Sequence, residues 1–256
     1  MYVKRFLICV GTLLLSSHFS ATALPLQSDA SPEKMLQRTY DAALKDASVP
    51  TPAAIVTDLT IISNSNPSLV WDNKHTHLLV VTWKNRDTFQ RYYQNEKRTS
   101  ANENSVTWVT AVPEVQKFCQ QYFGETKDDA ALNLRLKEYL GLHPSRQYDV
   151  FVEMWVRPSD LFRPCPDPEI SDSQCRLELS DRSPKVRHIK NYNDFYRDLY
   201  YKSFRSALGV PWTGLGYTYD WGNPTSKKGN SEFVLVPKAA YAIRRAVPTA
   251  EYCSPN

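Results

Sequence analysis

The chain has 256 residues, of which 42% are hydrophobic, so it is globular and long enough to bury a core. Its formal net charge is +4 at pH 7. Without Lys4 and Arg5, which belong to the N-terminal segment described next, the 31 basic residues become 29, against 27 acidic ones. This near balance argues against a nucleic-acid-binding protein.

The first 23 residues have the pattern of a secretion signal. Lys4 and Arg5 form its charged start, and the apolar run from Phe6 to Leu15 is too short to span a bilayer. Ala21-Thr22-Ala23 is a small-residue cleavage site. We expect cleavage after Ala23 and export of residues 24–256 to the periplasm or the extracellular space, with no membrane association; the alternative is an uncleaved anchor.

Cysteine usage agrees with export. Four cysteines remain after cleavage: Cys119, Cys165, Cys175 and Cys253. An even number in an exported chain predicts two disulfides. Three pairings are possible; the local one joins Cys165 to Cys175 in a small loop, and Cys119 with Cys253 would then tie the C-terminal tail to the middle of the chain. A metal site is the alternative, but the spacing matches no zinc pattern, so we expect neither metal nor cofactor.

The N-terminal half alternates predicted helices and strands. Ser31-Pro32-Glu33 starts a helix, because serine is a good cap and proline is tolerated at the first helical position. Alternation over 55–62 predicts a strand. A hairpin follows over 69–83, with 78–81 apolar on both faces and therefore central in a sheet. The next predicted elements are a short helix over 86–98, a strand over 106–112, a helix from 113 to about 124, and a helix begun by the capping box Thr126-Lys127-Asp128-Asp129 and ended by Gly141.

The C-terminal half has the same irregular order. Asn191 caps a predicted helix that Gly209-Val210-Pro211 ends. The other expected elements are a strand over 148–157, one helical turn over 158–162, a proline-rich, disulfide-bounded surface loop over 163–183, and strands over 231–236 and 240–247. Interleaved helices and strands without a repeat predict a single α+β domain, with a mixed or mostly antiparallel sheet packed by several helices.

One candidate site lies on the strand over 148–157. Its second face carries Glu153 between Phe151 and Trp155. Burial between two rings raises a carboxyl pKa, which suits a general acid, and Arg157 on the same face is able to bind an anionic group. The alternative is an ordinary wet sheet face with a cross-strand salt bridge.

A second candidate is the aromatic stretch from Pro211 to Trp221. If this stretch is extended, its rings share one face, namely those of Tyr217, Tyr219 and Trp221. Asp220 lies on the other face, and Glu232 follows the same connection. Two carboxylates beside aromatic rings are what a glycoside hydrolase uses, although such rings suit sugar or peptide binding equally well. The alternative is a glycine-enabled turn packed by aromatic residues.

A third candidate is His75-Thr76-His77. Histidines two positions apart on a strand share a face and can bind one metal ion, with His143 or His188 as a further ligand. Simple exposure at the start of a strand is the alternative. The chain contains no G-x-S-x-G, H-E-x-x-H, P-loop or G-x-G-x-x-G motif.

Two blocks of the sequence carry a resemblance. They are Glu153 to Glu169, and Pro211 to Trp221 followed by Ser231-Glu232-Phe233-Val234. They resemble a group of uncharacterised exported bacterial proteins, and the likeness covers most of the chain from about Leu78 onward. It implies a bacterial periplasmic or secreted setting and no known activity, so no catalytic residue is carried over from it.

Because no enzymatic motif is present, the leading hypothesis is an exported, disulfide-stabilised protein that binds a small molecule, carbohydrate or protein through an aromatic-lined cleft. The ligand-binding residues would be Trp155, Arg157, Tyr217, Tyr219 and Trp221. One alternative is a glycosidase-like hydrolase that uses Glu153, Asp220 and Glu232 as paired carboxylates. The other is a secreted toxin or effector. Whether the protein is an enzyme stays open at this point.

Overall fold

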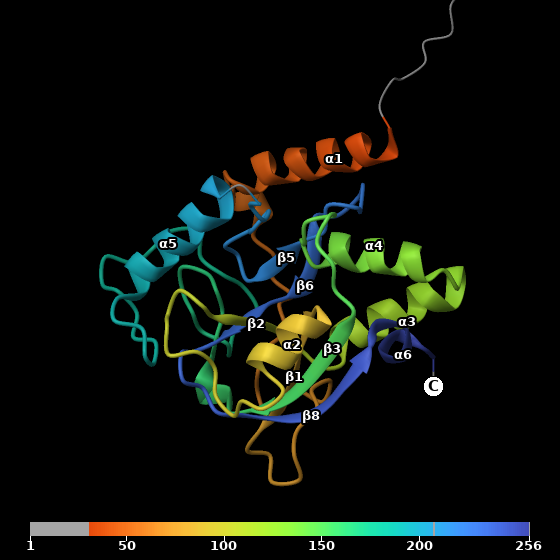
Figure 1. Ribbon diagram of the computed structural model, residues 1–256. Helices are drawn as coiled ribbons and strands as arrows, with labels where there is room; N and C mark the ends of the chain where they lie inside the picture. The colour runs from red at the N-terminus through yellow and green to blue at the C-terminus, as the bar shows by residue number, and fades with distance from the viewer. Residues whose placement is uncertain (1–30, 207, 256) are drawn as a thin grey trace, which may run out of the picture.

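A computed structural model describes residues 31–206 and 208–255 of the chain (Figure 1). The signal peptide expected over residues 1–23 lies outside these described residues. Within them the chain forms six α-helices, a six-stranded sheet and a small two-stranded sheet. This confirms the predicted α+β class. No helix in the described ranges is both long enough and apolar enough to cross a membrane.

The large sheet is antiparallel throughout, in the order β4-β7-β2-β1-β3-β8. Its strands are β1 (Leu78–Lys84), β2 (Thr107–Ala111), β3 (Val150–Val156), β4 (Leu161–Phe162), β7 (Phe233–Leu235) and β8 (Tyr241–Pro248). The β1–β3 ladder runs from the pair Leu78 and Val156 to the pair Lys84 and Val150. The apolar run 78–81 therefore occupies the central position that its composition predicts.

Helices cover both faces of this sheet, which is why its central strands are apolar on both sides. Leu78 and Val80 share a core with Phe195, and we call this side the α5 face. Leu79 and Val81 share a second core with Val115 on what we call the α3 face. The helices of the two faces are α2 (Arg86–Tyr92) and α5 (Tyr192–Arg205) on the first, and α3 (Glu114–Thr126), α4 (Asp129–Tyr139) and α6 (Thr249–Cys253) on the second. Figure 1 shows α3, α4 and α6 grouped at the right of the sheet.

The small sheet holds the aromatic stretch between the core and the first helix. It consists of β5 (Tyr217–Tyr219) and β6 (Lys228–Ser231), and α1 (Pro32–Ala47) crosses above it in Figure 1. Tyr40 of α1 packs against Tyr219 and Trp221, and the Ser31 side chain caps α1 as predicted. The extended conformation considered for Pro211 to Trp221 is thus a strand only over Tyr217–Tyr219.

Several sequence-based predictions are wrong in detail, among them the helix expected over 86–98, which ends at Tyr92. Residues 55–62 form no strand, because they lie beside a proline-rich loop and make only isolated hydrogen bonds to it. The Leu59 N–H donates to the Ser173 carbonyl, and the Ile62 N–H donates to the Ile170 carbonyl. The α4 cap is Asp128 rather than Thr126. The strand expected over 231–236 is interrupted at Glu232, where the chain passes from the small sheet to the large one. The terminal helix α6 had not been predicted.

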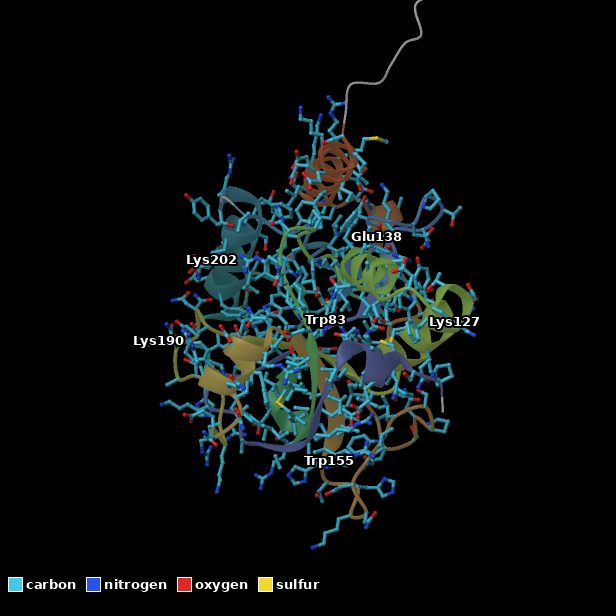
Figure 2. The ribbon with its side chains drawn as sticks, turned by 45° about the vertical axis from the view of Figure 1, so that its right-hand side comes forward. Trp83, Lys127, Glu138, Trp155, Lys190 and Lys202 are labelled. Atoms are coloured by element: carbon cyan, nitrogen blue, oxygen red, sulfur yellow. A yellow bond between two sulfur atoms is a disulfide. The ribbon has the colours of Figure 1, made fainter. Side chains whose placement is uncertain are left out.

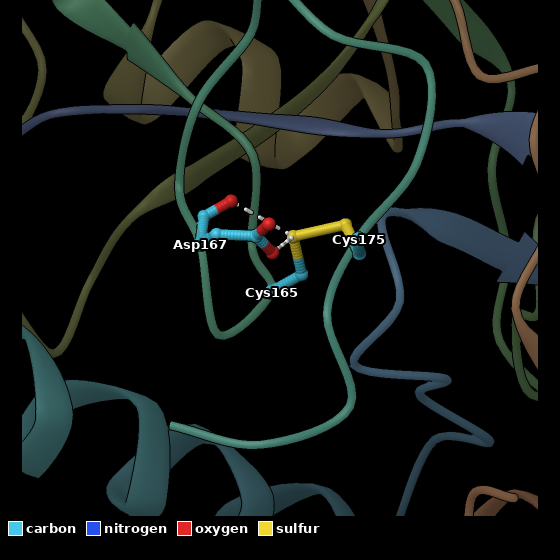
Figure 3. A group of neighbouring side chains, drawn as sticks. All are labelled: Cys165, Asp167 and Cys175. Carbon is cyan, nitrogen blue, oxygen red and sulfur yellow. Dashed lines mark hydrogen bonds between the residues drawn. A yellow bond between two sulfur atoms is a disulfide. The ribbon is translucent and has the colours of Figure 1, made fainter. Parts of the chain in front are cut away.

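Both expected disulfides are present, and of the three possible pairings the structure has the one with the local Cys165–Cys175 bond. Cys119 bonds to Cys253 and connects α3 to α6, while Cys165 bonds to Cys175. The second disulfide lies beside Asp167, whose carbonyl oxygen is 3.1 Å from Cys165 Sγ (Figure 3). These three residues form the one group of potential metal ligands found in the described part of the chain. Their sulfurs are bonded to each other, whereas metal ions bind thiolates, so the contact belongs to the disulfide.

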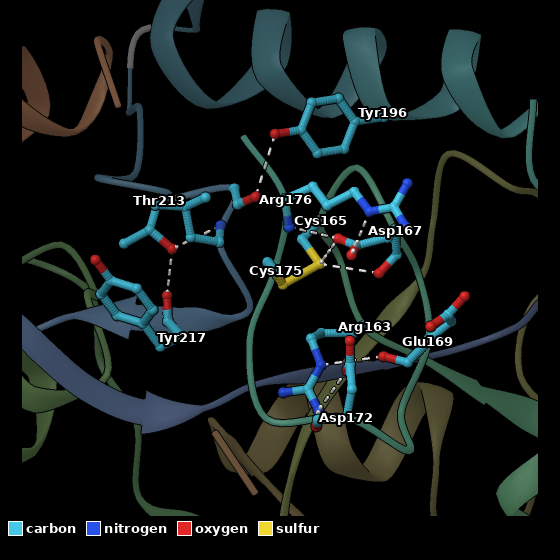
Figure 4. Close-up of a disulfide and its surroundings, with 12 residues drawn as sticks. Arg163, Cys165, Asp167, Glu169, Asp172, Cys175, Arg176, Tyr196, Thr213 and Tyr217 are labelled. Carbon is cyan, nitrogen blue, oxygen red and sulfur yellow. Dashed lines mark hydrogen bonds and ion pairs between the residues drawn. A yellow bond between two sulfur atoms is a disulfide. The ribbon is translucent and has the colours of Figure 1, made fainter. Parts of the chain in front are cut away.

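The loop over 163–183 is anchored by a buried arginine rather than lying wholly on the surface. Arg163 is fully buried and donates from Nε to the Glu169 carbonyl (3.1 Å) and from Nη2 to the Asp172 carbonyl (2.9 Å) (Figure 4). Gly216 packs against the stem of Arg163, and a Cβ there would lie 2.6 Å from Cδ. With φ at +78°, Gly216 is a position that only glycine occupies without strain.

Candidate functional site

A cavity of about 260 Å³ lies between the α3 face of the sheet and the β5–β6 hairpin. Strand pairing builds its sheet wall: the β1–β3 register sets Trp83 opposite Phe151, and their rings stack with centroids 5.3 Å apart. Trp108 of β2 extends this wall, and Figure 2 shows Trp83 near the centre of the molecule. Seven aromatic residues line the cavity: Trp83, Trp108, Tyr148, Phe151, Trp212, Tyr217 and Tyr219.

The hairpin wall is held rigidly by hydrogen bonds that point away from the cavity. The Tyr217 hydroxyl donates to the Ala54 carbonyl (2.7 Å), and the Tyr219 hydroxyl donates to the Asp46 carboxylate (2.8 Å). Trp83 likewise donates its indole N–H to Thr249 (2.9 Å). These three residues therefore offer ring surface to the cavity, while their polar atoms are paired elsewhere.

Glu232 is the only carboxylate among the described residues that line this cavity. It occupies the single position between β6 and β7, where the interruption of the strand leaves its side chain buried beside Trp212. Desolvation raises the pKa of Glu232 to about 8, and the nearby Trp212 indole N–H opposes the shift. The two side chains do not reach hydrogen-bonding geometry, since Glu232 Oε1 and Trp212 Nε1 are both buried without a partner.

Glu153 lies outside the cavity, in a salt bridge. It is 0% exposed on the α3 face of β3, where Arg245 donates to it from Nε and Nη2, each at 2.8 Å, and Arg244 donates from Nη1 at 3.1 Å. Arg245 pairs across the strands with Glu153, so the cross-strand salt bridge is present, although the face is buried rather than wet. Trp155 lies further along β3, near the lower edge of the molecule in Figure 2, and Arg157 is exposed beyond the strand.

Asp220 also has a partner of its own. Arg135 of α4 donates to both of its carboxylate oxygens, at 2.8 and 2.5 Å, and to Glu138 at 3.2 Å. Trp221 donates its indole N–H to the Leu142 carbonyl and packs under α1, outside the cavity. Of the three carboxylates considered for hydrolysis, only Glu232 lines the cavity. The geometry therefore gives no support to a glycosidase-like pair.

The histidines lie in different surroundings. His77 Nδ1 is 3.2 Å from the Asp72 carboxylate, and the His75 ring stacks over Trp71 with centroids 6.3 Å apart. His143 packs edge to face against Tyr40 of α1. His188 lies in the loop before α5, with φ at +62°. Neither of these is among the partners of His75 or His77.

Sequence reasoning missed most of the cavity wall and a second buried acid. Glu114, expected only as a helix start, accepts a hydrogen bond from the Thr60 hydroxyl, and burial raises its pKa to about 7. Trp83, Trp108 and Trp212 were each visible as large aromatic residues on or beside predicted strands. No local sequence pattern connects these three residues, because it is the order of the strands in the sheet that brings them together. An acid directly after a proline at a helix start is too common to mark Glu114.

No protein-family model, curated protein or solved structure matches the chain. The resemblance to exported bacterial proteins stays a prediction.

The Glu153 salt bridge yields an asymmetric stability prediction. Removing Arg245 leaves the Glu153 carboxylate, which is 0% exposed, without its bidentate partner. Removing the Glu153 charge instead leaves Arg244 and Arg245, whose side chains are 48% and 38% exposed and can be hydrated. We expect Arg245→Met to lower the free energy of unfolding in urea by about 2 kcal/mol, with Arg244 as the remaining partner, and Glu153→Gln to cost less.

The matched control is Arg197→Met, which removes a pair exposed on both sides, with Asp194, and should cost under about 0.5 kcal/mol. A larger loss for Glu153→Gln than for Arg245→Met would contradict the asymmetry.

Proposed function

We propose that the protein is an exported, disulfide-stabilised binding protein that holds a compact small molecule in the aromatic cavity beside Glu232. The observation that carries the proposal is the unpartnered Oε1 of Glu232 in a cavity lined by seven aromatic residues. Buried polar atoms in folded proteins nearly always have a partner, so an unpaired atom in an apolar cavity indicates where a polar group of a ligand belongs.

The dimensions of the cavity favour a small molecule over the other partners considered. Its volume of about 260 Å³ is just below the range of roughly 300–1,000 Å³ typical of ligand pockets. A compact molecule with one ring or a short branched chain fits, while an oligosaccharide or a folded protein does not enter. Two disulfides are compatible with an oxidising compartment, and the N-terminal secretion pattern supports export.

A pair of matched variants tests this function. Val210 is half-buried and lines the cavity, whereas Val186 is half-buried and lines a different groove beside the loop over 163–183. We expect tert-butylbenzene at pH 6 to change the tryptophan fluorescence of the wild-type protein saturably. Val210→Phe should weaken this binding at least about tenfold by filling the cavity, and Val186→Phe should leave it unchanged.

Equal affinities of the two variants would contradict the proposed function, and so would a wild-type protein that binds neither tert-butylbenzene nor its trimethylammonium analogue.

A further inference from the structure

We infer that the ligand of this cavity is a compact organic cation whose positive charge pairs with the Glu232 carboxylate and whose body lies against the tryptophan rings. This inference rests on the proposed function and adds to it the charge of the ligand.

The ring surfaces of the cavity favour positive charge. Aromatic rings carry negative potential on their faces, and tryptophan binds cations more strongly than the other ring side chains. Three tryptophans line this cavity: Trp83, Trp108 and Trp212. The Trp108 and Trp212 rings meet edge to face, with centroids 6.4 Å apart, and Tyr196 packs on Trp212 from α5. A cation in this space is attracted both by the rings and by the carboxylate that adjoins them.

No basic side chain in the described part of the chain forms an ion pair with Glu232. Lys84 is the only basic residue among the described residues that line the cavity, and its position in β1 matches that of Leu78 and Val80 on the α5 face. Its Nζ lies 5.4 Å from the centre of the Tyr93 ring, in the core of that opposite face. The backbone of Lys84 therefore borders the cavity while its charge lies on the other side of the sheet.

The charged and hydroxyl groups of the cavity disfavour an anionic ligand, and the one unpaired donor of the lining that the structure describes, Trp212 Nε1, lies beside the Glu232 carboxyl. An anion would meet the Glu232 carboxyl and no basic side chain among the described residues that line the cavity, so its charge would be buried without a partner. The hydroxyls of Tyr217 and Tyr219 donate outward, and the Thr218 hydroxyl donates to the Tyr139 carbonyl (2.7 Å). A neutral apolar molecule fills the volume but leaves Glu232 Oε1 unpaired. An organic cation satisfies both the rings and the carboxylate.

Binding of a cation is then linked to a proton. Since the pKa of Glu232 is about 8 without ligand, the carboxyl is largely protonated at pH 7, and binding releases one proton from it to the solvent. The tyrosines that face it stay neutral near pH 7, because burial raises the pKa of Tyr217 to about 12 and raises those of Tyr148, Tyr196 and Tyr219 as well. The other charged groups on the surrounding elements include Lys84, Glu114, Lys117, Arg135, Lys137, Glu138, His143, Arg163, Asp220 and Lys228.

Glu114 is the group in this set that needs a control. Its pKa of about 7 falls in the same range, and its neighbour Val115 lines the cavity. Its carboxylate, however, accepts from Thr60 and is not itself part of the lining. Substitution of Glu114 by glutamine therefore removes a titration without removing the charge that the ligand would contact.

Two probes of equal size test the inference. Phenyltrimethylammonium and tert-butylbenzene have the same shape and differ by one positive charge, which the ammonium keeps at every pH. Tryptophan fluorescence titrations from pH 6 to pH 9, at constant ionic strength, should show the affinity for the cation rising about 50-fold between pH 6 and pH 8 and then levelling. At pH 9 the cation should bind at least about tenfold more tightly than the neutral probe. Glu232→Gln should abolish the pH dependence and reduce the preference to the part that the tryptophan rings supply, and Glu114→Gln should preserve both the pH dependence and the full preference.

The outcomes separate the two proposals. Saturable binding of tert-butylbenzene with no preference for the cation at pH 9 would overturn the ligand charge and leave the proposed function standing. A preference for the cation that is undiminished in Glu232→Gln would overturn the role of this carboxylate. Binding of neither probe would overturn both proposals.

Discussion

Removal of the Cys119–Cys253 disulfide by the double substitution Cys119→Ala/Cys253→Ala is expected to lower the free energy of unfolding by about 5 kcal/mol. The two cysteines are 134 residues apart, and the entropy that a cross-link removes from the unfolded chain grows with the logarithm of that separation. Cys165 and Cys175 are only 10 residues apart, so Cys165→Ala/Cys175→Ala should cost about 3 kcal/mol.

Urea denaturation under non-oxidising conditions compares the two double variants directly. The long-range disulfide also holds α6 against α3, and both of its sulfurs are buried in the α3-face core, so its loss should loosen the packing of Tyr252 on Phe151. An equal or greater loss of stability for the local disulfide would show that chain entropy does not set the order.

The second large effect is a loss of stability as pH rises. The pKa of Glu232 is about 8 in the folded protein and close to 4.5 in the unfolded chain, so between these values the folded state binds more protons. Stability associated with this carboxyl is fully present below pH 4.5 and is lost as pH rises to 8. We expect Glu232→Gln to abolish a decline on the order of 4 kcal/mol between pH 5 and pH 9.

Glu114 causes a second loss of stability with rising pH, because its pKa in the folded protein is raised to about 7. The difference in free energy of unfolding between Glu114→Gln and the wild-type protein should therefore increase with pH only up to about pH 7. The corresponding difference for Glu232→Gln should increase up to about pH 8. Urea denaturation at pH 5, 7 and 9 distinguishes them. If the free energy of unfolding depends on pH in the same way for Glu232→Gln and the wild-type protein, this carboxyl is hydrated in the folded state.

Features of the fold that depend on short stretches of chain were predictable. Ser31 and Asn191 cap their helices because a capping side chain needs only the next two or three residues. The run 78–81 is central because apolar residues on both faces demand cover on both faces. Residues 55–62 were predicted wrongly, since their alternation reflects packing under a loop more than 100 positions later, with which they form isolated hydrogen bonds.

The candidate site was predicted in part, for the same physical reason. The aromatic stretch supplied the hairpin wall, because alternation along β5 is a local property. The opposite wall depends on the β1–β3 register, which brings Trp83 to Phe151 across 68 positions of sequence. Likewise, Glu153 was recognised between two aromatic residues, but its partner Arg245 lies on β8, so sequence alone left the salt bridge and the general acid as alternatives.

The position of a bound probe decides whether the aromatic cavity beside Glu232 is the binding site. Intermolecular NOEs should be measured at pH 9 between phenyltrimethylammonium and the side chains of the protein. We expect contacts of the probe with the ring protons of Trp83 and Trp212 and contacts of the ammonium methyls with the Glu232 side chain, all lost in Val210→Phe. Contacts only with residues of the groove beside the loop over 163–183, or none in the cavity at saturating probe, would contradict this expectation.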